Sequence, residues 1–454
     1  MTTLHKLGTR CLLIALTMYL VMTGATVPTA LYGLWAARYG FGTLMVTVIF
    51  SVYVVGVVIG LLGLGGLSDA IGRRPVLLAA IAASAVSDAA YLHANTLSAI
   101  FVARLISGLA TGLVAGTATA AMVDIAPSQL RGAASTTALV ANAGGLASGP
   151  VLGGAFAQYL SSPTRLVYVA HLTLLVVATI GTLIALPRGT RRPEVSLRPR
   201  GLAVPAQVRT AFWRSSTAGG SGFAVAGLLN AAIGLFLVQL AHVHDLLLAG
   251  VIAGLTFGTV GLGQILGRWL AAQAGLFVAC GGLLLSCLLN AVSLALGSVD
   301  LLVLAGMTAG TSTGLAIGHG IATINTQCPP ERRGETNSAF FAVMYIGLSV
   351  PVIGAGVAVD AMGLQSGGEL FSGAVAVIVA GVGLSLLTDM SRHPEATDPG
   401  ATHPKATHPA APPPGPAIPH VPAPAVASVA PAPPAAAEQP PAHPRHPARA
   451  VLHL

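Results

Sequence analysis

The sequence predicts an all-α membrane protein with twelve transmembrane helices in two pseudo-symmetric six-helix bundles. Three observations predict this class: 54% of the 454 residues are hydrophobic, only 8% are charged, and the apolar residues fall into twelve long runs. A soluble domain carries about 25% charged residues, so this chain lacks the polar side chains that would cover a water-facing surface. A spanning helix needs about 20 predominantly apolar residues, which is the length of each run.

The expected spans follow the apolar runs in order. Most of them contain Gly and Ala at a small-xxx-small spacing, which lets helix backbones pack closely in lipid. The spans cover residues 11–33, 43–65, 75–94, 97–122, 134–157, 165–186, 218–240, 247–272, 275–296, 300–323, 337–359 and 368–388.

Composition divides the chain into four parts. An N-terminal bundle (1–186) and a C-terminal bundle (218–388) hold six spans each, and an Arg-rich cytoplasmic linker (187–217) joins them. The tail (389–454) is rich in Pro, Ala and His. Sequence of that kind cannot bury a core, so we expect a disordered C-terminal tail.

Lys and Arg are distributed unequally between the two sides of the membrane. With a cytoplasmic N-terminus, the outer loops carry only Arg38 and Arg165, and the other loop Lys and Arg fall inside. The positive-inside rule therefore predicts that both termini are cytoplasmic. The high Ala, Pro and Arg content is typical of a high-GC bacterium, which places the protein in a bacterial inner (plasma) membrane.

Several function classes are excluded by the residues present. The net charge of +8 is spread between apolar runs, without the aromatic-interleaved basic patch of a nucleic-acid binder. The sequence has no Walker loop and no His, Cys and acidic residues at metal-ligand spacing. We therefore expect no enzyme activity, no cofactor, no metal and no nucleic-acid partner, and the lipid bilayer as the main surrounding.

The two halves of the chain repeat each other. PSQLRG (127–132) precedes the fifth span and PPERRG (329–334) precedes the eleventh, at an offset of 202 residues. PVLG (150–153) then matches PVIG (351–354), at an offset of 201. Parallel repeats of six spans are typical of transporters whose substrate site lies between the halves near the midplane.

One loop motif indicates a family. GGLSDAIGRRPVL (65–77) matches the signature G-x-L-x-D-x-x-G-R-R/K at every fixed position, although Ala70 stands where a basic residue is usual. The chain thereby resembles the major facilitator superfamily over about residues 10–388. The resemblance implies the major facilitator fold and a conformational latch formed by Gly65, Asp69, Gly72, Arg73 and an acidic residue at the end of the fourth span, Asp124.

The fourth span carries Arg104 in RLISGLATG (104–112), which is similar to the family pattern R-x-x-x-G-x-x-x-G. A membrane-embedded Arg needs a partner or water, and Asp88 in the third span, at a similar depth, is the expected partner. The resemblance implies a role for Arg104 and Asp88 in proton coupling. The alternative is that Arg104 reaches outward as an interfacial anchor and that Asp88 lies in the outer interface.

The fifth span carries GLASGPVLGG (145–154), which resembles the motif of the antiporter branches and in particular of 12-span drug:proton antiporters. Ordinary small-residue packing is the alternative. The motif residues are Gly145, Gly149, Pro150, Gly153 and Gly154.

Polar and aromatic residues within spans are the candidates for a substrate cavity, although packing or an interhelical hydrogen bond is the commoner role of such residues. The first span contains no Asp or Glu, which disfavours a strongly cationic substrate. The cavity candidates are Tyr32, Asn142, Asn230, His319, Phe341 and Tyr345.

Taken together, these patterns predict a secondary transporter. The leading hypothesis is a monomeric proton-coupled antiporter that exports small amphipathic molecules, such as drugs or metabolites, by alternating access. Its partners are then a small-molecule substrate and protons. The first alternative is a uniporter or symporter for a small nutrient, and the second is a transport-dead membrane sensor or assembly protein.

Overall fold

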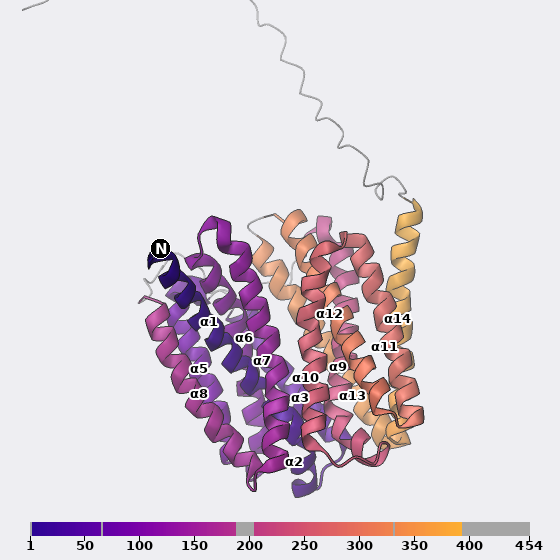
Figure 1. The fold of residues 1–454 in the computed structure, drawn as a ribbon. Coiled ribbons are helices and arrows are strands. Elements are labelled where there is room, and N and C mark those ends of the chain that lie inside the picture. Colours follow the sequence, from indigo (N-terminus) through magenta and orange to yellow (C-terminus); the bar gives the residue numbers. More distant parts are fainter. Residues whose placement is uncertain (1, 65–66, 188–203, 330–331, 393–454) are drawn as a thin grey trace, which may run out of the picture. The chain divides into compact units, whose positions relative to one another are not determined.

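The computed structural model describes residues 2–64, 67–187, 204–329 and 332–392, and all regular structure in this part of the chain is helical. Twelve of its helices are long and apolar enough to cross a membrane, as the sequence predicts. They run between two faces, and α1 begins at the upper face of Figure 1, hereafter the N-terminal face. The elements of the first half are α1 (Thr2–Thr26), η1 (Val27–Leu31), α2 (Tyr32–Tyr39), α3 (Thr43–Val58), η2 (Ile59–Gly63), α4 (Leu67–Ile71), α5 (Arg73–Leu92), α6 (Leu97–Ile125), η3 (Ser128–Leu130), α7 (Arg131–Tyr159) and α8 (Pro163–Ala185).

The second half repeats the first with fewer short elements. Its elements are η4 (Ala206–Val208), α9 (Arg209–Gln239), α10 (Leu246–Leu266), η5 (Gly267–Trp269), α11 (Ala272–Leu296), α12 (Val299–Gln327), α13 (Arg333–Met362) and α14 (Leu364–Arg392).

Helix packing follows the internal repeat. In the first half α1 packs against α7, α5 packs against α6 and α8, and α3 packs against α6. In the second half α9 packs against α13, α11 packs against α12 and α14, and α10 packs against α12. The two halves meet where α7 packs against α10 and where α3 packs against α13. These two contacts are equivalent, because α7 and α13 hold the same place in their halves, and so do α10 and α3.

The first span is one continuous path with a break in its middle. It runs through α1, η1 and α2 from Leu7 to Tyr39. Pro28 lies in η1 and has no N–H to donate to the preceding turn, so the α-helical hydrogen bonding stops there. The tighter η1 turn re-aims the chain before α2 begins at Tyr32, and all five of its residues are buried.

The linker is shorter than the sequence predicts. It was expected to reach residue 217, but α9 begins at Arg209. Polar residues extend this helix because they find partners: Arg214 Nη1 lies 2.9 Å from Asp389 Oδ2 and Arg214 Nε donates to Ser385 Oγ at 2.8 Å, both on α14. Residues 188–203 of the linker and 393–454 of the tail lie outside the described residues.

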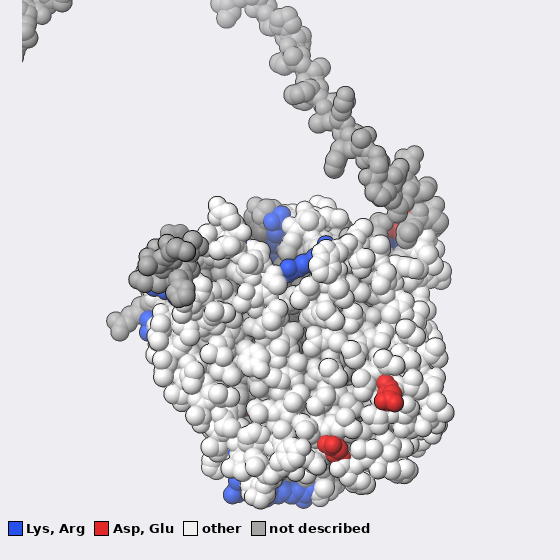
Figure 2. Space-filling view, in the orientation of Figure 1, with Lys and Arg blue, Asp and Glu red and all other residues white. Residues whose placement is uncertain are grey.

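Charge on the described surface follows the pattern of a membrane protein. Figure 2 shows Lys and Arg near the two ends of the visible face, separated by a broad band that is mostly uncharged. Large apolar side chains such as Val176 of α8, Leu288 of α11 and Val377 of α14 are exposed on the surfaces of their helices. Exposed apolar surface of this kind fits contact with lipid rather than with water.

Candidate functional site

A cluster of charged side chains surrounds Arg73 at the start of α5. Its Nη1 lies 2.6 Å from Asp69 Oδ1, and its Nε donates to Asp124 Oδ2 at 3.0 Å. Gly72 precedes it at φ +96°, a conformation that side chains rarely adopt. The structure thus brings together Asp69, Gly72, Arg73 and Asp124, as expected for a latch, whereas Gly65 lies outside the described residues.

A hollow of about 220 Å³ adjoins this cluster. Asp69 and Arg73 line it together with residues of η2 and α6, and Ser338 of α13 lines it from the second half. The Arg73 cluster therefore lies at a place where the two halves approach each other on the N-terminal face.

The glycines of α7 let its backbone approach α1 and η1 closely. A Cβ added to Gly153 would lie 2.5 Å from the carbonyl oxygen of Val27, and one added to Gly149 would lie 2.9 Å from the Val27 amide nitrogen. A Cβ on Gly145 would lie 2.7 Å from Met22 Cβ. Any side chain at these positions would force the helices apart, so the motif residues fix the α1–α7 distance.

Gly154 faces α10 of the other half instead. A Cβ there would lie 2.5 Å from the Leu246 carbonyl oxygen, and Gly250 packs in turn against the carbonyl of Pro150. Gln158 Oε1 accepts a hydrogen bond from the Leu246 amide at 3.0 Å near the same end of α7. The motif on α7 therefore contacts the first span on one side and the second half on the other.

Arg104 is buried in the first half, with 1% of its surface exposed. Its Nε donates to Tyr32 Oη at 2.7 Å, its Nη2 also contacts Tyr32 Oη, and its Nη1 donates to the Ala25 carbonyl at 2.7 Å. The guanidinium carbon lies 5.2 Å and 5.3 Å from the ring centres of Tyr32 and Tyr53, within cation–π range. Arg104 therefore points inward, and the cavity candidate Tyr32 is its hydrogen-bond partner.

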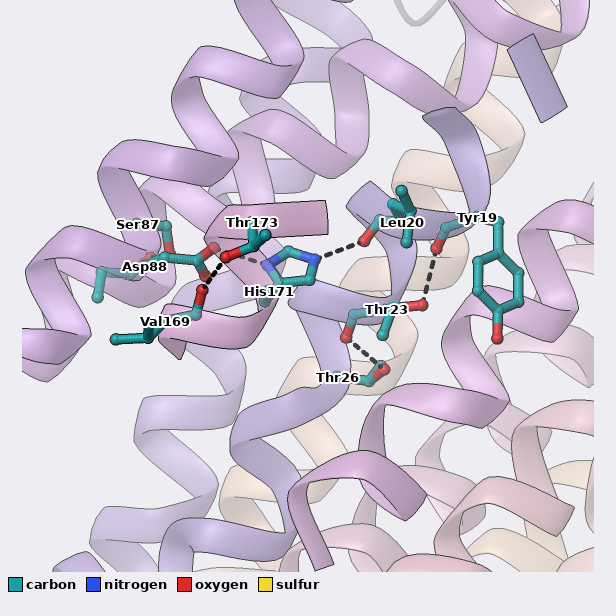
Figure 3. A network of polar contacts seen from close by, with 10 residues as sticks. Tyr19, Leu20, Thr23, Thr26, Ser87, Asp88, Val169, His171 and Thr173 are labelled. Carbon is teal, nitrogen blue, oxygen red and sulfur yellow. Dashed lines mark hydrogen bonds and ion pairs between the residues drawn. The ribbon is translucent and has the colours of Figure 1, made fainter. Parts of the chain in front are cut away.

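Asp88 does not pair with Arg104, so the expected pairing is wrong. Its Oδ2 lies 2.6 Å from Nδ1 of His171 on α8, and only 2% of Asp88 is exposed. Figure 3 shows the imidazole between Asp88 on one side and α1 on the other, where Nε2 bonds to the Leu20 carbonyl at 2.8 Å. The pair is enclosed by α1, α5 and α8, so Asp88 is shielded from the surface of the protein.

His171 is the functional candidate that sequence reasoning missed. It lies in the sixth span, and nothing in that span's composition separates it from a packed residue. Two signals lay outside that composition: an ionisable residue inside a membrane span is a candidate by default, and the internal repeat matches Asp88 and His171 with the polar Asn290 and Ser372 at offsets of 202 and 201 residues.

The remaining cavity candidates are dispersed. Asn142 and Phe341 are half-buried on α7 and α13. Asn230 donates to the Ala226 carbonyl of its own helix at 2.6 Å, and its Oδ1 has no partner among the described residues. His319 lies against Gly275 of α11, and its Nε2 is buried without a hydrogen-bond partner among the described residues.

Aromatic side chains do meet between the halves. Phe50 and Tyr53 of α3 belong to the same apolar cluster as Leu348 of α13, and Tyr345 packs against that cluster. The Tyr345 ring stacks on Phe223 of α9 at 6.0 Å. Tyr345 is therefore the cavity candidate that lies at the junction of the two halves, one helix away from Arg104.

Comparison with family models identifies one family. Residues 12–351 match the family model described as Major Facilitator Superfamily. A stretch of 107 residues is 34% identical to the tetracycline resistance protein, class E, of Escherichia coli, which is 24% of this chain and about a quarter (26%) of that protein.

Solved structures show the same fold. A bacterial homologue of the human lysosomal transporter Spinster, inward-facing and unoccupied, has a TM-score of 0.60 at 15% identity and covers 85% of this chain and 95% of its own. The human organic anion transporter MFSD10 (TETRAN) has a TM-score of 0.57 at 17% identity and covers 83% of this chain and 99% of its own.

Proposed function

The chain belongs to the Major Facilitator Superfamily, and from this premise we propose that it is a proton-coupled antiporter that exports small amphipathic molecules. Members of the superfamily are secondary transporters rather than enzymes, and this chain is a multi-pass membrane protein of that kind. The direction of transport, the coupling ion and the substrate class are the parts that we propose.

The observation that carries the antiporter proposal is the complete motif on α7. Gly145, Gly149 and Gly153 contact the first span, whereas Gly154 contacts α10 of the other half. A motif placed this way connects α1, which holds Leu20 and Ala25, to the interface between α7 and α10. That interface lies between the two halves and must change during alternating access. The partial match to a tetracycline resistance protein supports export as the direction.

Proton coupling is supported by two buried ionisable groups of the first half, Arg104 and Asp88. Charges inside a membrane are costly and usually mark a transport or proton pathway. Arg104 reaches the Ala25 carbonyl just before η1, where the first span is broken. A positive charge held at this point interacts electrostatically with a proton-binding group or with a substrate that enters beside Tyr53.

The substrate class follows from the surface between the halves. Its described residues are mainly aromatic and aliphatic, including Phe50, Tyr53, Tyr345 and Leu348. Arg104 adds a positive charge behind Tyr53, and the first span has no acidic residue. An apolar molecule with a neutral or weakly anionic polar end fits these walls better than a strong cation.

The Arg73 cluster is the proposed conformational latch. Its ion pairs join α4, α5 and the end of α6, and the adjoining hollow reaches Ser338 of α13. Rocking of the two halves would change this hollow directly. We also propose, from the positive-inside pattern, that the N-terminal face is cytoplasmic and that the protein acts as a monomer in a bacterial inner membrane.

The test uses purified protein in liposomes that contain a trapped pH-sensitive dye, with an imposed pH gradient. A panel of dyes, antibiotics including tetracycline, and sugars is screened for substrate-triggered proton movement. We expect proton movement opposite to substrate movement, and loss of export when an ionophore dissipates the gradient. Arg104→Lys is the matched variant, since it keeps the charge but loses the planar donor fork that Tyr32 and Ala25 share.

Each outcome has a defined meaning. Export that continues unchanged after the gradient is dissipated refutes proton coupling. Substrate and protons that move in the same direction indicate a symporter. If Arg104→Lys still couples substrate movement fully to proton movement, the guanidinium of Arg104 is not required for coupling, because the lysine ammonium cannot make the same set of bonds.

A further inference from the structure

Asp88 and His171 form a buried pair at the junction of three helices. The side chain of His171 is 0% exposed and that of Asp88 is 3% exposed. The imidazole bonds through Nδ1 to Asp88 Oδ2 at 2.6 Å and through Nε2 to the Leu20 carbonyl at 2.8 Å. One side chain of α8 thus connects α5 with the backbone of α1 (Figure 3).

The two hydrogen bonds determine how many protons the pair holds. A carbonyl oxygen only accepts, so Nε2 carries a hydrogen and donates it to Leu20. The contact between Nδ1 and Oδ2 needs one further hydrogen, because two bare lone pairs at 2.6 Å would repel each other. An imidazolium facing a carboxylate and a neutral imidazole facing a carboxylic acid both meet this requirement, and both have zero net charge.

We propose that the Asp88–His171 pair is the binding site of the coupling proton, which it holds in the conformation described here and releases in the opposite one. The proton comes from bulk water on one side of the membrane and leaves to bulk water on the other. Its release converts the neutral pair into a neutral imidazole facing a carboxylate, with a net charge of −1. The inference deepens the proposed antiporter function and rests on it.

The internal repeat indicates that the ionisable groups are not needed for folding. Asn290 lies 202 residues after Asp88 and Ser372 lies 201 residues after His171, the same offsets as those of the sequence motifs. In the second half, Asn290 Nδ2 donates to Ser372 Oγ at 2.9 Å between α11 and α14. A neutral hydrogen bond therefore joins these two helices in one half, and the other half replaces it with groups that bind a proton.

The pair also acts on the helix that the α7 motif contacts. Gly24 has no side chain where the imidazole lies, and a Cβ there would collide with the ring. On another side of α1, Thr23 Oγ1 and Ser148 Oγ of α7 are 2.9 Å apart. Loss of the proton weakens the contact between Asp88 and His171, which holds the imidazole against α1. The protonation state of the pair therefore affects the contact between α1 and α7.

The titratable groups around the pair come from three neighbouring elements. Tyr91 of α5 and Tyr168 of α8 stack with 4.7 Å between their ring centres. Ring contacts continue through Trp35 to Tyr32, which is the hydrogen-bond partner of Arg104 of α6. The hydroxyls of Tyr91 and Tyr168 are buried and have no hydrogen-bond partner among the described residues. α1 contributes the Leu20 carbonyl, and α7 carries its titratable residues only at its two ends. Burial of the pair opposes the net charge that it carries without its proton.

The first experiment measures protonation without any substrate. Infrared difference spectra of the purified full-length protein are recorded between acidic and alkaline buffer, with and without 15N-labelled histidine. We expect a carboxyl band that Asp88→Asn lacks, and label-sensitive ring bands that His171→Gln lacks. If both variants reproduce the wild-type difference spectrum in full, the proposal is overturned.

The second experiment measures coupling with the panel compound that triggers proton movement in wild-type liposomes. The readout is the ratio of proton-driven transport to counterflow, in which labelled and unlabelled compound exchange without a gradient. We expect Asp88→Asn to lower this ratio at least tenfold and Ser372→Ala, the matched change in the other half, to keep it. An unchanged ratio in Asp88→Asn overturns the inference.

Two provisions keep the outcomes distinct. If the wild-type protein moves no protons with any compound, the proposed function fails and the inference fails with it. If both the wild-type protein and Asp88→Asn couple substrate movement to proton movement, only the inference is overturned. If Asp88→Asn does not fold, Asp88→Glu retains a titratable group on a longer side chain. We then expect coupling with a displaced pH profile, and a profile equal to that of the wild type overturns the proposal.

Discussion

Gly153 and Gly354 occupy the same position of the internal repeat, yet we predict opposite effects when each is changed to Ala. A Cβ on Gly153 would lie 2.5 Å from the Val27 carbonyl oxygen, whereas nothing lies within 4 Å of a Cβ on Gly354. The two variants add the same methyl group to the same motif. They differ only in what that methyl group meets.

The magnitude follows from this contact. An ordinary contact begins near 3.4 Å, so α7 and η1 must separate by about 0.9 Å (3.4 minus 2.5) at Gly153. Overpacking of a tight contact costs about 1–3 kcal/mol, and Ala in place of Gly returns about 0.8–1 kcal/mol of helix propensity. Gly153→Ala should therefore lower stability by roughly 0–2 kcal/mol, and Gly354→Ala should raise it by about 1 kcal/mol.

Thermal unfolding in one detergent, at one scan rate, measures the difference. A thiol-reactive dye reports unfolding, because Cys280, Cys287 and Cys328 are buried in the folded protein. At about 2 °C per kcal/mol for a chain of this size, the Gly354→Ala variant should melt about 2–6 °C above the Gly153→Ala variant. Equal melting temperatures, or the reverse order, would refute the close approach of α7 to η1.

Four further substitutions test three other contacts. Asp69→Asn and Arg73→Ala should each slow turnover about fivefold and leave substrate binding mostly intact, since partly exposed ion pairs contribute up to about 1 kcal/mol each; normal turnover in both variants would discredit the latch. Gly154→Ala should separate α7 from α10 and slow transport more than it lowers the melting temperature, and a change in melting temperature alone would place the contact outside the transport cycle. Arg214→Ala should lower the melting temperature by a few degrees through the loss of its bonds to α14, with initial transport rates unchanged, and an unaltered melting temperature would contradict that tie.

The twelve spans could be predicted from the sequence because the hydrophobic runs are long and the loops between them are short. The helix ends were less predictable. Arg209 and Arg214 lie inside α9, since a helix continues past the apolar run wherever its polar residues find partners. The break at Pro28 was also not predicted, because hydropathy treats α1, η1 and α2 as one run.

The partner of Asp88 could not be read from depth alone. Asp88 and Arg104 lie at similar depths on neighbouring helices, but helices that are apolar on all sides do not reveal which face is turned toward which neighbour. Packing turns Arg104 toward Tyr32 and Asp88 toward His171. The internal repeat carries the missing information, since Asn290 and Ser372 mark the same helix pair in the second half.

The contact between α7 and α10 consists almost entirely of backbone and small residues. Gly250, Gly254, Gly258 and Gly261 of α10 follow one another at successive turns and face Pro150, Ala147 and Ala143 of α7. Surfaces without long side chains have no rotamers to reorganise and few interlocking ridges, so one helix can slide along the other at low cost. The α7–α10 part of the seam therefore favours shear, whereas the α3–α13 part, with Phe50, Tyr53 and Leu348, must repack its side chains when the halves move.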